Sequence, residues 1–544
     1  MRQALAACTV LALLLVHPVV FSPASTALGH PEADTFNHIW GFHQVVSSLM
    51  EGHSPLWTDR VGHPSGGALW FIDLFNASWT LPLQLLGGPV LAYNVALLAN
   101  LVLAGVATWG LAREAGASPG GAALAAVAYE AQPQLLAQLH NGISETVSAG
   151  WLPLALWAFL VFRRRPDRWT ALRAGLALTA CGLANWYYGL FAGLAAAGLV
   201  LGLRGERGRA VARQLGWAAL GTLPLACALG LFRGTLLADD ALVVRDADFV
   251  WASLVGHNMV DVLAFFHPGD FHSPDLRALF DEELVVCTYI GWALLLPALI
   301  GAWRMRGARP WAGAALVCFV FALGPFLYYA GSYAQLPSGD PVPLPFLALF
   351  QGLPLFSTIS HAFRFAVPLQ LCLAICAALA LDRWGFVLSG VLLAELLWLS
   401  PAPWPTPASS VEVPEVYALI EADGAVLDLP VTLQVLARSR YDLYQIDHGR
   451  PIPYAFNDPS PKVLEANRLT RFLIEIERSS VDSLPPQPTL DLVLGARQLR
   501  ADGFAAIVVH RESYPPRKAT LVVQQLSALL GEGTAAGTAT VFFL

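Results

Sequence analysis

Two carboxylates, Glu32 and Asp34, lie two positions apart just after the first apolar run of the chain. In an extended segment, residues i and i+2 point to the same side, so both carboxylates would face one space. Such a pair could hold a divalent cation such as Mg²⁺ or Mn²⁺, or one carboxylate could act as a general base whose pKa the other tunes. The alternative is a solvated loop in which Asp34 only caps the next helix.

The segment that carries this pair, residues 29–78, concentrates acids, histidines and tryptophans in a chain with 13% charged residues. Its histidines lack the spacing of a zinc site, and His38 and His43 are five apart, which takes them off one helical face. We expect one or two of them, with His38 as the candidate, to bind a sugar or phosphate. The apolar spacing over residues 36–50 predicts a helix along the membrane surface, and the turn-rich residues 61–71 predict that the chain doubles back.

Further polar residues stand at the ends of later apolar runs. The segment QLHNGISE carries Asn141 and Glu145, and NWYYG carries Tyr187 and Tyr188. We expect all four at the outer surface, where they could contact a substrate. The tyrosines have an alternative role in an interfacial aromatic belt.

An arginine, Arg364, opens a late apolar run beside His361, on the side where arginines are rare. A lipid phosphate at headgroup depth would explain it, because a guanidinium binds phosphate in bidentate fashion. The alternative is an ion pair with a loop acid. Arg245, another isolated outer arginine, is a second candidate for the same charge. For Glu395, in the middle of a run, we expect hydrogen bonds between helices rather than catalysis.

The composition defines the class. Of the 544 residues, 56% are hydrophobic, and the mean hydropathy of +0.55 predicts a polytopic α-helical membrane protein. We expect about eleven spans, at residues 4–24, 89–112, 119–137, 147–163, 169–184, 189–203, 214–232, 284–303, 310–330, 366–381 and 385–400. The net charge of -7 and the lack of a basic block argue against nucleic-acid binding. No P-loop, GxGxxG or HExxH motif occurs.

The arginine clusters predict the orientation. They all fall on one side of the predicted spans, which the positive-inside rule assigns to the cytoplasm. The loops 29–78, 138–146, 235–283 and 331–365 would then lie outside. With an odd number of spans, we expect the N-terminus inside and the C-terminal region outside.

These patterns predict two domains joined by a linker. Residues 1–403 would form the membrane domain with its first outer loop at 29–78, residues 404–411 a Pro-rich linker, and residues 412–544 an extracytoplasmic α/β domain. In the last, AVLDLPV, FAAIVVHR and TATVFFL read as strands. EVYALIEADG, SPKVLEANRLTRFLIEIERS and KATLVVQQLSALLGEG read as helices.

The spaced acidic pair Glu32 and Asp34, the surface helix after it, the outer pair Arg364 and Phe365, and the outer C-terminal domain together resemble the GT-C superfamily of membrane glycosyltransferases. The bacterial branch near the YfhO-like and dolichyl-phosphate-mannose-type mannosyltransferase families is the most similar. The C-terminal stretches AVLDLPV, YDLYQIDHGRPI and GFAAIVVHR resemble that branch as well.

This resemblance implies sugar transfer from a polyprenyl-phosphate donor to a hydroxyl of a glycan, lipid or protein acceptor. It places the enzyme at the outer face of a bacterial inner membrane, and it implies Asp34 as the catalytic base with Glu32 as its partner. No second acidic pair of the DxD kind is evident, which leaves metal dependence open. Direct displacement with one base would invert the anomeric centre.

Two other functions compete with this interpretation. A transporter or flippase of lipid-linked sugars would show functional charges in mid-span and inverted repeats. A non-catalytic envelope scaffold would bind a partner through its C-terminal domain and would not need Asp34. The concentration of polar residues in the outer loops favours the enzyme.

Overall fold

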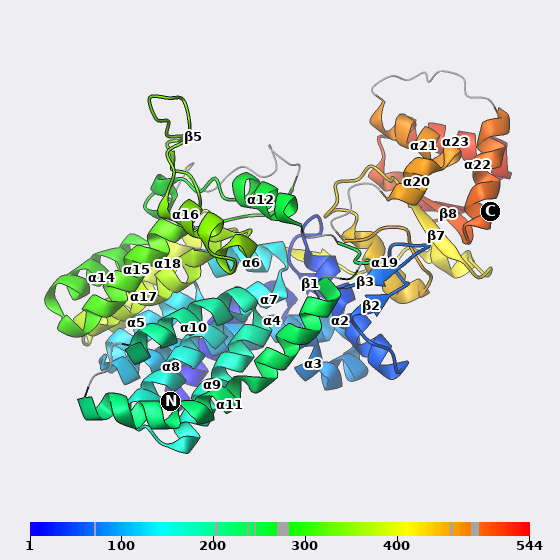
Figure 1. Ribbon diagram of the computed structural model, residues 1–544. Helices are drawn as coiled ribbons and strands as arrows, with labels where there is room; N and C mark the ends of the chain where they lie inside the picture. The colour runs from blue at the N-terminus through cyan, green and yellow to red at the C-terminus, as the bar shows by residue number, and fades with distance from the viewer. Residues whose placement is uncertain are drawn as a thin grey trace. The chain divides into compact units, whose positions relative to one another are not determined.

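The computed structural model (Figure 1) describes residues 1–69, 72–201, 205–236, 238, 240–243, 246–268, 282–456, 461–479 and 489–544. The chain is mostly helical and divides into two compact units. The first, here called the helical unit, comprises Met1–His30, Asp73–Phe232 and Arg245–Ser409. The second, here called the mixed unit, comprises Pro31–Ile72, Arg233–Val244 and Ser410–Leu544. The loop with the acidic pair therefore belongs to the same unit as the C-terminal region.

The helical unit is built from helices, with short connections in its N-terminal half and longer ones before α14 and α16 (Figure 1). They are α1 (Arg2–Leu15), α3 (Leu74–Trp79), α4 (Leu81–Ala115), α5 (Pro119–Glu130), α6 (Pro133–Asn141), α7 (Ser144–Val147), α8 (Trp151–Arg164), α9 (Arg168–Ala184), α10 (Trp186–Leu201), α11 (Gly205–Leu236), α12 (Ala247–Gly256), α14 (Trp292–Arg304), α15 (Arg309–Ala322), α16 (Pro345–Gly352), α17 (Ala366–Ala380) and α18 (Trp384–Trp398). Short strands β1 (Thr26–Leu28), β4 (Tyr328–Tyr329), β5 (Ser332–Tyr333) and β6 (Ala408–Ser410) form two small ladders.

Local sequence signals set the ends of these helices. Asp167 starts α9 with a capping box, in which its carboxylate accepts from the backbone N–H of Trp169 at 2.8 Å and of Thr170 at 3.1 Å. Ser118 caps α5 in the same way, ahead of a proline in the first turn. Inside the unit, α5 packs on α4, α17 and α18. Gly121 permits that approach, because a Cβ there would lie 2.1 Å from the carbonyl oxygen of Ala378.

A helix lies in each of the eleven predicted apolar runs, but their lengths differ from the prediction. Among the described residues, four helices are long and apolar enough to cross a membrane: Leu81–Ala115, Ser144–Arg164, Gly208–Thr235 and Ala362–Ala380. Four more are apolar but shorter: Arg2–Leu15, Ala247–Gly256, Trp292–Arg304 and Trp384–Trp398. The first run shows the reason, because α1 stops before Pro18 after 14 residues, a rise of roughly 21 Å. The total of eleven spans stays a prediction.

Glu395 has the structural role that its position predicts. Its Oε1 accepts from the Tyr289 hydroxyl and from the backbone N–H of Trp292, each at 2.6 Å. Its Oε2 accepts from the backbone N–H of Ala293 at 2.8 Å. A carboxylate on α18 thus accepts hydrogen bonds from the free backbone N–H groups at the start of α14. Its negative charge also interacts favourably with the positive end of that helix dipole.

The predicted orientation can be tested by labelling two introduced cysteines. Ser410→Cys, at an exposed position after the last helix of the helical unit, should react with a membrane-impermeant maleimide in intact cells. Arg306→Cys, exposed on the predicted cytoplasmic side, should react only after permeabilisation. A cysteine-free background is needed because native Cys227 is exposed. The reverse pattern of labelling would invert the topology. The neighbouring Ser409 is a poor probe site because it is buried, with its hydroxyl bonded to Gly29.

In the mixed unit, a helix and the predicted turn of the first loop are both present, and the place of this helix along the membrane surface stays a prediction. The helix is α2 (Thr35–Met50), and the chain then doubles back through β2 (Trp57–Thr58) and β3 (Gly67–Ala68), which pair antiparallel. Gly66 makes this reversal possible at a φ of 60°, since a Cβ there would lie 2.4 Å from the carbonyl oxygen of Thr58.

The C-terminal part of the mixed unit contains a four-stranded sheet in the order β7-β8-β10-β9, with β7 and β8 parallel and the other pairs antiparallel. Its strands are β7 (Ala425–Leu429), β8 (Phe504–His510), β9 (Thr534–Ala536) and β10 (Ala539–Phe543). Its helices are α19 (Ser439–His448), α20 (Lys462–Ala466), α21 (Arg468–Arg478), α22 (Thr489–Ala501) and α23 (Pro516–Leu530). Strands β7 and β8 are buried along their whole length, as continuous apolar runs predict.

The predicted strands are confirmed, but two predicted helices differ from the structure. EVYALIEADG forms only a 3₁₀ turn at Glu415–Leu419. The helix predicted over residues 460–479 breaks in two at Asn467, whose side-chain oxygen accepts from the backbone N–H of Leu469 and Thr470 and so starts a new helix. A capping residue inside an amphipathic pattern was the signal for this break.

An ion pair is buried in the core of this sheet. The carboxylate of Asp428, on β7, accepts from the Tyr417 hydroxyl at 2.6 Å and lies 3.0 Å from Nε2 of His510, on β8. The His510 side chain is 1% exposed, and its Nδ1 lies 3.7 Å from Glu512. Burial alone would lower the pKa of His510, but the bond to Asp428 and the charge of Glu512 raise it above its ordinary value. His448 stacks on Tyr417, and burial lowers its pKa to about 4.

These two histidines predict opposite pH dependences for the stability of the mixed unit. The contribution of His510 is complete below about pH 6.5, its unfolded pKa, and is lost as the pH rises through its higher folded pKa. That of His448 is lost as the pH falls from about 6.5 toward 4. Hydrogen exchange of β7 and β8 should therefore be slowest near pH 6.5, after correction for intrinsic rates.

Asp428→Asn provides the check on this pH dependence. It should remove the loss of protection at high pH and destabilise the unit by about 3–5 kcal/mol, because it leaves a buried imidazolium without its carboxylate. A wild-type protection profile that does not change between pH 6.5 and 9 would contradict the assignment to His510.

Candidate active site

The acidic pair lies on a turn rather than on the predicted extended segment. Residues 31–34 form the turn, and Asp34 has φ −75° and ψ 4°, because the chain is already entering α2. Asp34 holds the N-cap position, yet its Oδ1 accepts from the side-chain amide of Asn37 at 3.0 Å instead of from the backbone. Glu32 is half-exposed and lies 4.0 Å from Arg440. Both carboxylates remain partly accessible to solvent.

The surroundings of the two carboxylates bear on the predicted cation. Among the described residues, no three His, Cys, Asp or Glu side chains lie close enough to hold a metal ion. Asn37 donates to Asp34, and the guanidinium of Arg440 lies near Glu32. Mg²⁺ is commonly held by one or two carboxylates together with water and substrate phosphates. The cation predicted at Glu32 and Asp34 therefore stays a prediction.

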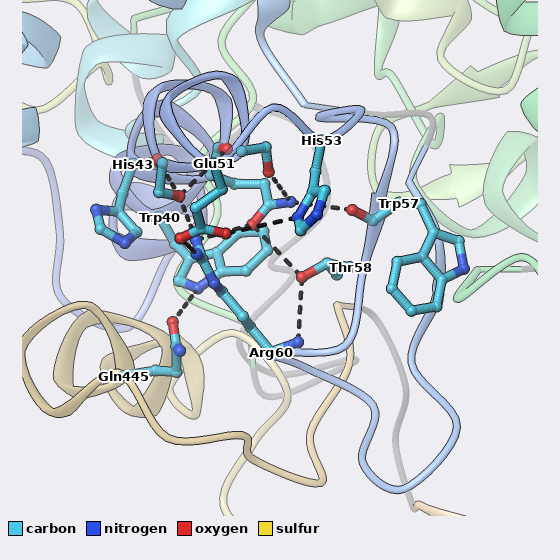
Figure 2. Close-up of polar contacts among 11 residues, drawn as sticks. Trp40, His43, Glu51, His53, Trp57, Thr58, Arg60 and Gln445 are labelled. Carbon is cyan, nitrogen blue, oxygen red and sulfur yellow. Dashed lines mark hydrogen bonds and ion pairs between the residues drawn. The ribbon is translucent and has the colours of Figure 1, made fainter.

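Helix α2 is fixed to a segment from the other end of the chain. It packs on α19, and Nε1 of Trp40 donates to Oε1 of Gln445 at 2.8 Å. The Ser439 hydroxyl donates to the carbonyl oxygen of Ala33, between the two acids, at 3.4 Å. Figure 2 shows Trp40 and Gln445 facing each other at this contact. The C-terminal part of the chain thus sets the position of the acidic turn.

The far end of α2 is closed by Arg60, shown in Figure 2. Its guanidinium bonds to the Ser47 hydroxyl and to the Glu51 carboxylate. Thr58 accepts from the backbone N–H of Arg60 at 3.1 Å. Burial, followed by the positive charge of Arg60, lowers the pKa of His43 to about 4. His43 is therefore neutral at neutral pH. The substrate candidate His38 also lies on α2, at a half-buried position.

In the helical unit, the structure brings five of the predicted residues together. The guanidinium carbon of Arg364 lies 4.7 Å from the centre of the Tyr187 ring, a cation–π contact. The Tyr187 hydroxyl accepts from the backbone N–H of His361 at 3.2 Å. The charges of Arg364 and Glu145 act on each other and on the hydroxyl of Tyr188. The predicted substrate contacts Arg364, His361, Glu145, Tyr187 and Tyr188 thus form one cluster, here called the arginine cluster.

Arg364 has a donor that no described residue uses. It is half-buried, and its Nε is buried without a hydrogen-bond partner among the described residues. The segment before it is fixed by Asn258, which donates to the carbonyl oxygen of Ser360 at 2.8 Å and accepts from the backbone N–H of Phe363 at 2.9 Å. A guanidinium that retains an unused donor, on a rigid backbone, suits an anion with several acceptor oxygens.

A buried network next to the cluster was missed in the sequence. Oδ2 of Asp73 accepts from the Ser144 hydroxyl at 2.5 Å and from the Asn76 amide at 2.7 Å. The Asn76 carbonyl accepts in turn from Asn100 at 3.0 Å. Burial, then the charge of Glu145, raises the pKa of Asp73. The sequence signal for this network is a set of polar residues inside or beside apolar runs, because buried polar side chains need hydrogen-bond partners.

Asn141, another predicted substrate contact, holds a loop in place. Its side-chain amide exchanges two hydrogen bonds with the backbone of Val285, both 2.8 Å long. Its neighbour His140 stacks on His30 at 5.1 Å between ring centres. Arg245, the other predicted phosphate ligand, lies outside the described residues.

Comparison with solved structures shows a fold similar to that of an arabinofuranosyltransferase. The chain is similar to the arabinofuranosyltransferase AftD from Mycobacteria, with a TM-score of 0.54, 16% identity, and coverage of 100% of this chain and 40% of that chain. A mutant form of AftD gives a TM-score of 0.55 at 17% identity, with coverage of 100% and 41%. The chain thus spans about two fifths of the length of AftD. No family model and no curated protein matches the chain.

At these identities the similarity shows the fold alone. Membership of the GT-C superfamily, and of the branch near the YfhO-like families, stays a prediction.

Proposed function

We propose that this chain is a membrane glycosyltransferase that moves a sugar from a polyprenyl-phosphate donor to an acceptor hydroxyl. The arginine cluster is the observation that carries the proposal. A half-buried guanidinium with an unused Nε–H, stacked on Tyr187, suits the phosphate of a lipid donor. The likeness of the fold to that of the arabinofuranosyltransferase AftD supports the reaction class.

The proposed reaction is a single displacement. The acceptor hydroxyl attacks the anomeric carbon, and its proton passes to the carboxylate of Asp34 as general base. The bond from the anomeric carbon to the phosphate oxygen breaks, and the electron pair stays on the phosphate. For Arg364 we propose, independently of the place of Asp34, that it stabilises that added negative charge. One displacement inverts the anomeric centre. Glu32, half-exposed beside Arg440, tunes Asp34 from two residues away. We propose the outer face of a bacterial inner membrane as the place of reaction.

The direct test is transfer by the purified full-length chain from a synthetic polyprenyl-phosphate sugar. Release of polyprenyl phosphate together with a glycosylated acceptor is the expected result. An arm with EDTA measures whether a cation contributes. Movement of the donor across liposome membranes without any transfer would favour the flippase instead. The absence of both activities, with a panel of glycan, lipid and peptide acceptors, would favour the scaffold.

A further inference from the structure

Glu145 places a negative charge beside the arginine that should bind the donor phosphate. Its backbone is held on both sides. The hydroxyl of the preceding Ser144 donates to Asp73 at 2.5 Å, and Tyr188 donates to the carbonyl oxygen of the following Thr146 at 2.5 Å. Asn185 adds a bond to the carbonyl oxygen of Glu145 itself at 3.3 Å. The turn that carries the Glu145 carboxylate is therefore held in place beside the cluster.

Arg364 is held from the same segment. Its guanidinium stacks on Tyr187, next in the chain to Tyr188, and its charge acts on Glu145. The segment Asn185–Tyr188 thus contacts the turn of Glu145 and the arginine at once. Any anion bound to Arg364 also meets the field of a carboxylate on this fixed turn. A site built only for tight phosphate binding would not retain this charge, because like charges repel across a low-dielectric space.

The charges of donor and product differ in a way that this carboxylate can sense. The donor is a phosphodiester with one negative charge. Transfer leaves the electron pair on the phosphate, so the product is a monoester, which carries about −1.5 to −2 at pH 7. Arg364 attracts both lipids. Glu145 repels the more highly charged product more strongly.

We propose that Glu145 is a specificity-determining counterion that lets the site distinguish the donor from the spent carrier lipid and speeds release of that lipid. The inference rests on the proposed role of Arg364 as a phosphate ligand. It assigns to Glu145 a role that weakens binding of a charged product. Asp73, on which the charge of Glu145 acts, adds to the same field when it is ionised.

The test compares the affinity of the full-length chain for polyprenyl phosphate and for its methyl ester at pH 8. Glu145→Gln should tighten binding of polyprenyl phosphate on the order of tenfold, and binding of the methyl ester by clearly less. Glu145→Asp keeps the charge and should keep the wild-type ratio of affinities. Asp340→Asn, an exposed acid of the same unit, controls for loss of net charge.

A second arm uses pH. Near pH 5 the monoester carries about one charge, as the diester does, so the wild-type ratio of affinities should approach one. Equal tightening for both lipids, or weaker binding of both by Glu145→Gln, would overturn the inference. The outcomes separate from those of the proposed function. If the chain transfers sugar but Glu145→Gln leaves the ratio of the two affinities unchanged, only the role proposed for Glu145 is refuted. If the chain distinguishes the two lipids but transfers no sugar, only the proposed glycosyltransferase function is refuted.

Discussion

Asp34→Asn should lower the rate of sugar transfer about 10²–10⁴-fold, the usual contribution of a general base. The substitution keeps the shape of the side chain and an oxygen that can accept from Asn37, as Asp34 does at 3.0 Å. It removes only the ability to take a proton. We therefore expect expression and thermal stability close to wild type, and the loss should appear in kcat measured with a polyprenyl-phosphate donor.

Glu32→Gln is the matched control for this prediction. It removes a carboxylate from the same turn, and its 4.0 Å contact with Arg440 is partly exposed, so it should cost little stability. If Glu32 only tunes its neighbour, the rate should fall much less than in Asp34→Asn. Full transfer by Asp34→Asn would contradict the assignment, and the base would then be sought among Glu145, Asp73 and Asp246.

Much of the local structure could be predicted because it depends on neighbours in the sequence. The apolar spacing of residues 36–50 predicts α2, and the continuous apolar runs predict β7 and β8. Failures came where a single residue overrides a pattern. Asn467 divides one predicted helix by capping a second, and Pro18 follows the early end of α1.

Contacts between distant segments could not be predicted in this way. Trp40 and Gln445 are 405 positions apart, and no periodic pattern links them. The same holds for Asp73 and Ser144, 71 positions apart. Placing Glu145, Tyr187 and Arg364 at the outer ends of their runs limited where they could lie. Only the packing of the helices shows that they form one cluster. The sequence predicts at which end of its run each residue lies, but it does not predict which helices are neighbours.

Arg364→Ala should lower kcat/KM for transfer about 10²–10³-fold, because the charge that develops on the leaving phosphate loses its ligand. Arg364→Lys should retain part of the rate. A lysine keeps the positive charge and can still stack on Tyr187, but it cannot form two parallel bonds to one phosphate. The order wild type, Lys, Ala is thus the expected result in steady-state kinetics with a polyprenyl-phosphate donor.

Arg383→Ala, an exposed arginine of the same unit on the predicted cytoplasmic side, is the control for loss of a positive charge and should leave the rate unchanged. Binding of polyprenyl phosphate separates a role in binding from a role in folding. Arg364→Ala should weaken it while the thermal midpoint changes little, since a cation–π contact at a half-buried site contributes only about 0.5–2 kcal/mol. Near-wild-type rates and phosphate binding in both Arg364 variants would remove this residue from the site, and with it the observation on which the glycosyltransferase proposal depends.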